Sequence, residues 1–131
     1  MRERPLILFV DDEKDLLEIM ALKFGASGFD AVVAYNAKEA VDAAEKLHPD
    51  LILMDIHMPG ASGTDAALTI KQNPDTKDIK IIFLSSLKDP WPTTFADRNA
   101  LAKEIGVDDY IDKSDNLDKI VARVRQVLGM K

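Results

Sequence analysis

The apolar residues of this chain fall into short continuous blocks that alternate with segments of helical spacing. Continuous apolar runs are typical of strands buried on both faces of a sheet, and apolar residues three and four positions apart are typical of amphipathic helices. The runs predict strands at 6–10, 30–34, 51–55, 80–86 and 107–112. The spacing predicts helices at about 14–25, from Asn36 to just before Pro49, and at about 63–73, 95–105 and 115–128.

Strict alternation of strand and helix predicts an α/β fold in which a parallel sheet is covered by helices on both faces. Asn36, with Glu39 three positions later, has the pattern of a capping box and marks the start of the second helix. With 131 residues, we expect one domain, spanning 1–131.

Composition excludes several classes of protein. The chain has no cysteine, so disulfide frameworks, thiolate metal sites and thiol nucleophiles are ruled out. No apolar run approaches the length of a membrane span and the start lacks a signal peptide's apolar core, so we expect a cytoplasmic protein without membrane association. The formal net charge of −6 argues against direct nucleic-acid binding and suits an acidic pocket for a divalent cation.

Polar side chains appear where the predicted strands end. Asp11 and Asp12 follow the first strand, Asp55 ends the third, Ser85 lies at the end of the fourth, and Lys113 follows the fifth. Because the carboxyl ends of parallel strands share one edge of a sheet, we expect these residues to meet there. Carboxylates are suitable ligands for Mg²⁺, one of them can be a nucleophile toward phosphorus, and an ammonium group can neutralise a phosphoryl group.

These residues make the sequence resemble the receiver domain of two-component response regulators over essentially the whole chain. The matching elements are the pair Asp11-Asp12, "LILMDIHMPGASG" around Asp55, "FLSS" with Ser85, and "DDYIDK" ending in Lys113. The resemblance implies a doubly wound, flavodoxin-like sheet of five parallel strands in the order 2-1-3-4-5.

The resemblance also implies a phosphoryl-transfer chemistry. Asp55 would accept a phosphoryl group from a sensor histidine kinase or a histidine phosphotransfer protein. Asp12 and Asp55 would bind Mg²⁺, or alternatively Mn²⁺, together with the backbone carbonyl of His57, and Asp11 would act through a metal-bound water. Lys113 would contact a phosphoryl oxygen. Such a domain assists its own phosphorylation and dephosphorylation but works as a switch and not as an enzyme.

The resemblance further implies how the switch would be transmitted. The hydroxyl of Ser85 would move to the phosphoryl group, and Tyr110 would turn inward as Ser85 moves. The surface of the fourth helix, fifth strand and fifth helix would then bind a downstream protein. The domain itself would be a monomer or a phosphorylation-dependent dimer.

Each candidate also has a simpler structural interpretation. Acidic residues after a strand are often helix caps, a lone lysine such as Lys113 is by default a surface residue, and Ser85 by default ends a strand. Tyr110 could be an ordinary half-buried tyrosine. His57 could be an exposed loop residue; the alternative hypothesis, that its side chain tunes hydrolysis of the acyl phosphate, fails if His57→Ala leaves the dephosphorylation rate unchanged.

Two features depart from the family pattern. Ser114 follows Lys113 where the family usually has proline, and Ser114 and Asp115 are candidate N-caps for the last helix. The 28 positions between Ser85 and Lys113 exceed the usual spacing, with the excess assigned to the loop 87–94. Trp91 in this loop either anchors it on the core or contacts a partner.

Three functions remain open from the sequence. A phosphorylation-controlled receiver is favoured, and because the chain ends just after the last predicted helix we expect a stand-alone regulator, with an excised domain as the alternative. A non-phosphorylated pseudo-receiver would be expected to have lost the acidic pair, the acceptor or the lysine. A Mg²⁺-dependent aspartyl-phosphate phosphatase would need Asp-x-Asp after the first strand and a cap over its pocket.

Overall fold

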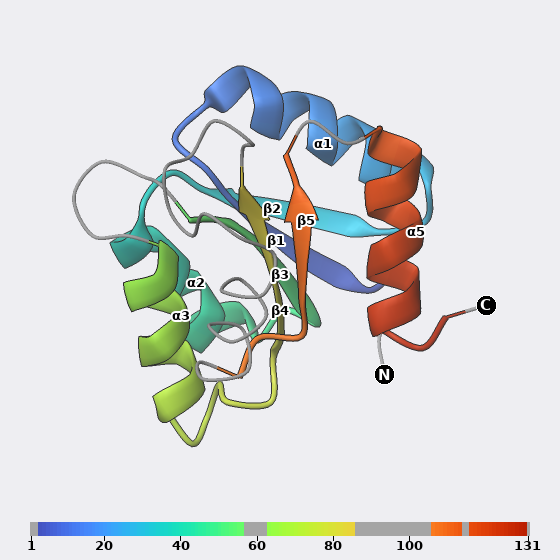
Figure 1. The fold of residues 1–131 in the computed structure, drawn as a ribbon. Helices are drawn as coiled ribbons and strands as arrows, with labels where there is room; N and C mark the ends of the chain where they lie inside the picture. The colour runs from blue at the N-terminus through green and yellow to red at the C-terminus, as the bar shows by residue number, and fades with distance from the viewer. Residues whose placement is uncertain (1–2, 57–62, 86–105, 114–115, 131) are drawn as a thin grey trace.

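The computed structural model describes residues 3–56, 63–85, 106–113 and 116–130, and these form a parallel sheet between two layers of helices (Figure 1). The strands are β1 (Leu6–Val10), β2 (Asp30–Ala34), β3 (Leu51–Asp55), β4 (Lys80–Ser85) and β5 (Asp109–Asp112). The helices are α1 (Lys14–Ala26), α2 (Ala37–Leu47), α3 (Gly63–Gln72) and α5 (Leu117–Val127).

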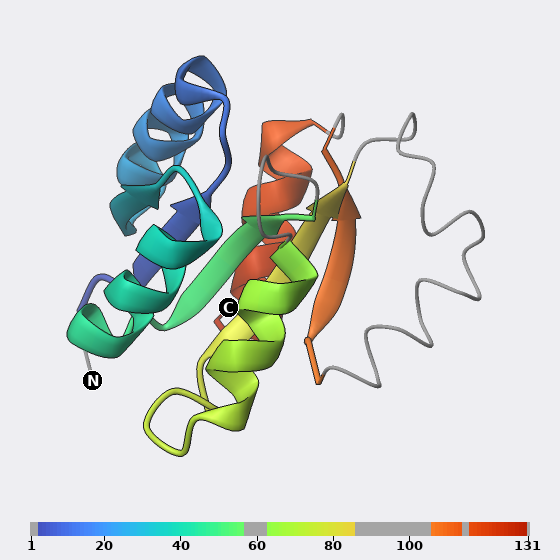
Figure 2. The same cartoon turned by 90° about the vertical axis from the view of Figure 1, so that its left-hand side faces the viewer.

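The sheet has the predicted fold. All strand pairs are parallel and their order is β2-β1-β3-β4-β5, as the doubly wound prediction requires. Helices α1 and α5 cover one face of the sheet and α2 and α3 cover the other (Figures 1 and 2). In the described part of the chain, no helix is both long and apolar enough to cross a membrane.

The continuous apolar runs reflect burial on both faces of the sheet. Alternate side chains of a strand point to opposite faces. In β1, Leu8 and Val10 therefore pack in the cluster beneath α2 and α3, whereas Ile7 and Phe9 pack in the cluster beneath α1 and α5. All four are at most 1% exposed, so neither face of the strand tolerates a polar residue until the strand ends.

The predicted boundaries are correct to within two residues where the structure describes them. The strands at 6–10, 30–34 and 51–55 are confirmed, and the strand predicted at 80–86 is observed to Ser85. The last strand begins at Asp109 instead of residue 107. Before it, the Asp108 carboxylate accepts a 2.9 Å hydrogen bond from the Ile81 amide at the start of the ladder. The helix predicted at 95–105 and the loop 87–94 lie outside the described residues.

One capping prediction is confirmed and the other is wrong. Asn36 accepts a 2.9 Å hydrogen bond from the Glu39 amide and caps α2. The last helix begins at Leu117, and its N-cap is Asn116, whose side chain accepts a 2.7 Å hydrogen bond from the Asp118 amide. The cap is therefore neither Ser114 nor Asp115. Asn116 is an equally good cap and sits one residue before the first apolar position of the helix.

Helix α3 begins directly against the end of β3. The Gly63 amide donates a 2.9 Å hydrogen bond to the Ile56 carbonyl. A Cβ atom at Gly63 would lie 3.0 Å from the Asp55 carbonyl carbon and closer still to its oxygen. Only glycine lets the helix approach this peptide so closely, which fixes the backbone of Asp55 between β4 on one side and α3 on the other.

We expect Gly63→Ala to lower the free energy of unfolding by about 1–3 kcal/mol, because the added methyl group must displace backbone atoms. Urea denaturation measures the loss. Gly25→Ala is the matched control, since a Cβ there meets nothing within 4 Å and φ is not positive. The control should leave stability unchanged or raise it by up to about 1 kcal/mol. Equal stability of Gly63→Ala and wild type would contradict the close packing of α3 on Asp55.

Candidate functional site

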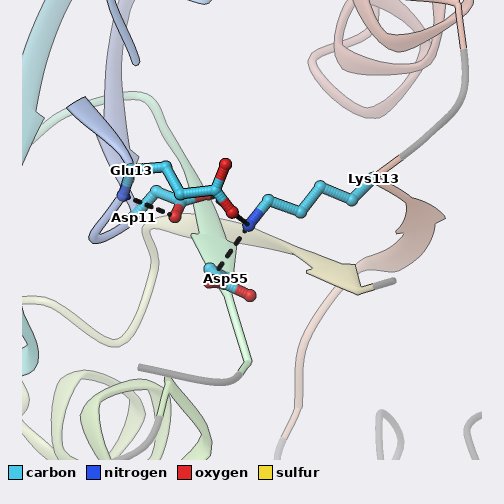
Figure 3. Close-up of polar contacts among 4 residues, drawn as sticks. All are labelled: Asp11, Glu13, Asp55 and Lys113. Atoms are coloured by element: carbon cyan, nitrogen blue, oxygen red, sulfur yellow. Dashed lines mark hydrogen bonds and ion pairs between the residues drawn. The ribbon is translucent and has the colours of Figure 1, made fainter. Parts of the chain in front are cut away.

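The carboxyl ends of the strands bring acidic side chains and one lysine together. Asp11 follows β1, Asp55 ends the neighbouring strand β3, and Lys113 follows β5. Since β4 lies between β3 and β5, the long side chain of Lys113 has to extend across the edge of β4 to reach the carboxylates, as Figure 3 shows. The expected meeting of these distant residues at one edge of the sheet is observed.

The Lys113 ammonium group contacts three carboxylates. Its Nζ atom lies 2.8 Å from Asp11 Oδ2, 3.2 Å from Glu13 Oε1 and 3.3 Å from Asp55 Oδ2 (Figure 3). Two of its N–H groups donate to Glu13 and Asp55, and Asp11 completes the surrounding carboxylates as an ion pair. The Lys113 side chain is 14% exposed, which places the contacts at the boundary between core and solvent.

Burial makes the charged form of Asp11 energetically unfavourable. The residue is 2% exposed, and its Oδ1 atom accepts a 3.0 Å hydrogen bond from the Glu13 amide. Oδ2 forms the ion pair with Lys113, yet none of the described groups donates to it with hydrogen-bond geometry. Burial raises the pKa of Asp11, and the Lys113 ammonium group and the Glu13 amide oppose that rise without cancelling it.

The charge of Lys113 is stabilised by the same cluster. Burial acts to lower the pKa of Lys113, but the close contact with Asp11 and the charge of Asp55 outweigh it, and the pKa is raised. Lys113 is therefore an ammonium ion throughout the neutral range, in contact with the carboxylates on both β1 and β3.

The three aspartates form an acidic pocket that could bind a metal ion. One carboxylate oxygen from each of Asp11, Asp12 and Asp55 lies within 4.8 Å of the others, with Asp12 exposed and the other two buried. Mg²⁺ binds oxygen at about 2.1 Å, which separates opposite ligands by about 4.2 Å, so small side-chain rotations would bring these oxygens onto one ion. The Asp11 oxygen that lacks an aligned donor is a further sign that the pocket fits a cation.

The structure describes only some of the remaining predicted residues. Ser85 ends β4 opposite Asp112 of β5, and Tyr110 is half-buried against the core cluster on the α2 and α3 face. The side chain of Ser85, together with His57, Trp91 and Ser114, lies outside the described part of the structure. Their proposed roles stay predictions.

The sequence reasoning gave Glu13 no role, although it contacts Lys113. Glu13 is the N-cap of α1, with φ −90° and ψ 100°. Its amide donates a hydrogen bond to Asp11 Oδ1 while its carboxylate lies 3.2 Å from Lys113 Nζ. A bend at Asp12 separates the two acidic residues, so no strand periodicity in the run Asp-Asp-Glu indicates that both side chains face Lys113.

Comparison with known protein families agrees with this geometry. The model of the response regulator receiver domain matches residues 7–125. The chain is 35% identical over 122 residues to the phosphate regulon transcriptional regulatory protein PhoB of Pseudomonas aeruginosa. It is 34% identical over 125 residues to the DNA-binding response regulator MtrA of Mycobacterium tuberculosis. These matches cover 93% and 95% of the chain but only 51% and 50% of the relatives, so the chain spans about half their length.

Solved structures of response regulators are also similar to this chain. A receiver domain of a Francisella response regulator aligns with a TM-score of 0.80 and 28% identity, covering 96% of this chain and 98% of that one. A response regulator receiver protein from Pseudomonas putida aligns with a TM-score of 0.81 and 28% identity, covering 96% and 99%. The chemotaxis protein CheY4 of Vibrio cholerae, at 20% identity, shares the fold with a TM-score of 0.83 over 95% and 98% of the two chains. This chain belongs to the family of response regulator receiver domains.

Proposed function

We propose that this domain is a phosphorylation-controlled switch in which Asp55 accepts a phosphoryl group from a sensor histidine kinase or a histidine phosphotransfer protein in the cytoplasm. The observation that carries the proposal is the position of the Lys113 ammonium group, 3.3 Å from Asp55 Oδ2 and 2.8 Å from Asp11 Oδ2. A cation held against an acceptor carboxylate at the edge of the sheet forms a site for a small dianion.

Asp55 and Lys113 have the chemical groups needed for transfer of a phosphoryl group from a phosphohistidine. A carboxylate oxygen of Asp55 would form a bond to phosphorus while the P–N bond of a phosphohistidine breaks, and the leaving imidazole nitrogen takes up a proton. The Asp55 side chain is only 4% exposed, so few waters need to be removed before attack. The Lys113 ammonium group would neutralise charge on the phosphoryl oxygens.

The acidic pocket has the donor set for the family's metal ion. Asp12 and Asp55 would hold Mg²⁺ directly, the His57 carbonyl would add a further ligand, and Asp11 would act through a bound water. The ion would supply charge neutralisation for the transferring phosphoryl group.

The response to phosphorylation would pass through the neighbouring strands. Ser85 lies on β4, beside the acceptor strand β3, and Tyr110 lies on β5, the next strand, where it packs against the core. Movement of the Ser85 hydroxyl toward the phosphoryl group, with Tyr110 turning inward, would reshape the surface around β5 and α5 for a downstream protein partner.

Incubation with acetyl phosphate and Mg²⁺ should add one phosphoryl group to the wild-type protein, because the Asp55 carboxylate can attack a small phosphodonor without a kinase. Intact-mass spectrometry measures the gain, and Asp55→Ala should abolish it. Asp42→Ala, which removes an exposed aspartate of α2, should still gain the group. No gain by the folded wild-type protein would contradict the proposal and favour a non-phosphorylated interaction module.

Mg²⁺ should raise the melting temperature, because a cation relieves the repulsion among the three aspartates. The stabilisation should reach about 2.7 kcal/mol at a hundredfold excess over Kd. Asp12→Asn should lose most of the gain, and the exposed control Asp42→Asn should keep it. An unchanged wild-type melting temperature up to roughly tens of millimolar Mg²⁺ would count against metal binding at this site.

A further inference from the structure

The geometry points to Glu13 as a positioning residue that acts through Lys113: its carboxylate competes with the incoming phosphoryl group for the ammonium ion and so slows phosphorylation of Asp55. This inference rests on the proposed function. It concerns a residue outside the three-aspartate pocket, since Glu13 contributes no ligand atom to that group.

The Lys113 ammonium group is already surrounded by three carboxylates: it donates to Glu13 and Asp55 and forms an ion pair with Asp11. The Nζ contacts to Asp11, Glu13 and Asp55 lie between 2.8 and 3.3 Å. A phosphoryl oxygen that binds Lys113 must therefore take the place of one of these carboxylates. The free-energy cost of binding the phosphoryl oxygen depends on which carboxylate leaves Lys113.

Glu13 is the partner that can leave. The Asp11 side chain is 2% exposed and is held by the Glu13 amide, so it cannot turn away from Lys113 into solvent. Asp55 is the acceptor itself. The Glu13 side chain is 63% exposed and can turn into solvent, where water replaces the lost contact. Figure 3 shows the long Glu13 side chain reaching Lys113 from the segment that also carries Asp11.

Lys113 stays in place when Glu13 is neutral. Its side chain is 14% exposed, and the contacts to Asp11 at 2.8 Å and Asp55 at 3.3 Å remain. Removing the Glu13 charge therefore weakens its contact with Lys113, so that a phosphoryl oxygen can take that place without releasing the lysine from the acceptor. It also removes one negative charge from the path of an anionic phosphodonor.

The test compares the rate of phosphoryl uptake from acetyl phosphate in wild type and Glu13→Gln, at saturating Mg²⁺ so that metal affinity does not enter. We expect the second-order rate constant of Glu13→Gln to be about two- to fivefold higher at low ionic strength, the factor that corresponds to an exposed ion pair. The difference should shrink with added salt, because screening weakens exposed charges. A purely structural role of Glu13 would not produce this salt dependence.

Glu18→Gln is the matched control. Glu18 is an exposed glutamate on α1, and its substitution changes the net charge by the same amount. Its rate constant should equal that of wild type. Equal rates for wild type and Glu13→Gln, or an equal increase in Glu18→Gln, would overturn the inference while leaving phosphorylation of Asp55 intact.

A second measurement does not depend on phosphorylation. Reductive methylation followed by peptide mass spectrometry reports the access of reagent to each lysine. Lys113 should be modified at least about twofold faster in Glu13→Gln than in wild type, because an exposed contact that shields it is gone. Lys23, which pairs with Asp118, is the internal reference and should not change. Unchanged modification of Lys113 would overturn the inference. Faster modification without phosphoryl uptake by either protein would uphold the contact and overturn the proposed function, together with the role of Glu13 in it.

Discussion

The site depends on one ion cluster, in which the ammonium group of Lys113 is held by carboxylates from two other strands. Asp11 and Asp55 are almost fully buried, and buried carboxylates are destabilising unless a cation or hydrogen-bond donors compensate them. Lys113 supplies that cation from across the sheet. The same interaction raises the pKa of the lysine and keeps it charged. A cation already placed against the acceptor is a preorganised partner for a phosphoryl group.

Among the described residues, acidic side chains occur at both edges of the sheet, and the three-aspartate pocket lies at the carboxyl edge. At the amino edge, Asp50 accepts a 2.8 Å hydrogen bond from the Leu6 amide and Asp108 accepts one from the Ile81 amide, so these carboxylates complete the strand ladders. At the carboxyl edge, Asp11 accepts one amide hydrogen bond and turns its other oxygen toward Lys113. The Asp50 and Asp108 carboxylates thus bind amides of their own sheet, with Lys71 and Lys80 near Asp108. Asp11 instead depends on the Glu13 amide and on the ammonium group of Lys113, which comes from across the sheet.

The fold and most of this edge could be predicted from the sequence because they depend on local patterns. A strand buried on both faces must be apolar throughout, so its first polar residue marks its end, as Asp11 and Asp55 do. Two details could not be predicted in this way. Three consecutive residues before the last helix, Ser114 to Asn116, are all of types that cap helices well, so residue type alone does not identify Asn116 as the N-cap. The role of Glu13 depends on its extended backbone, which a start of α1 one residue earlier would have changed.

Burial divides the four acidic residues of the site into two kinds. Asp11 and Asp55 are enclosed by the core, and any change in their size or charge disturbs the packing of β1 and β3 as well as the chemistry. Glu13 is exposed, and Asp12 is exposed as well, so substitutions there act on charge with little effect on packing. The kinetics of such a site can therefore be adjusted at its exposed rim while its buried part is kept. A carboxylate that reaches the central lysine from solvent is well suited to this, because it changes the availability of the ammonium group without moving it.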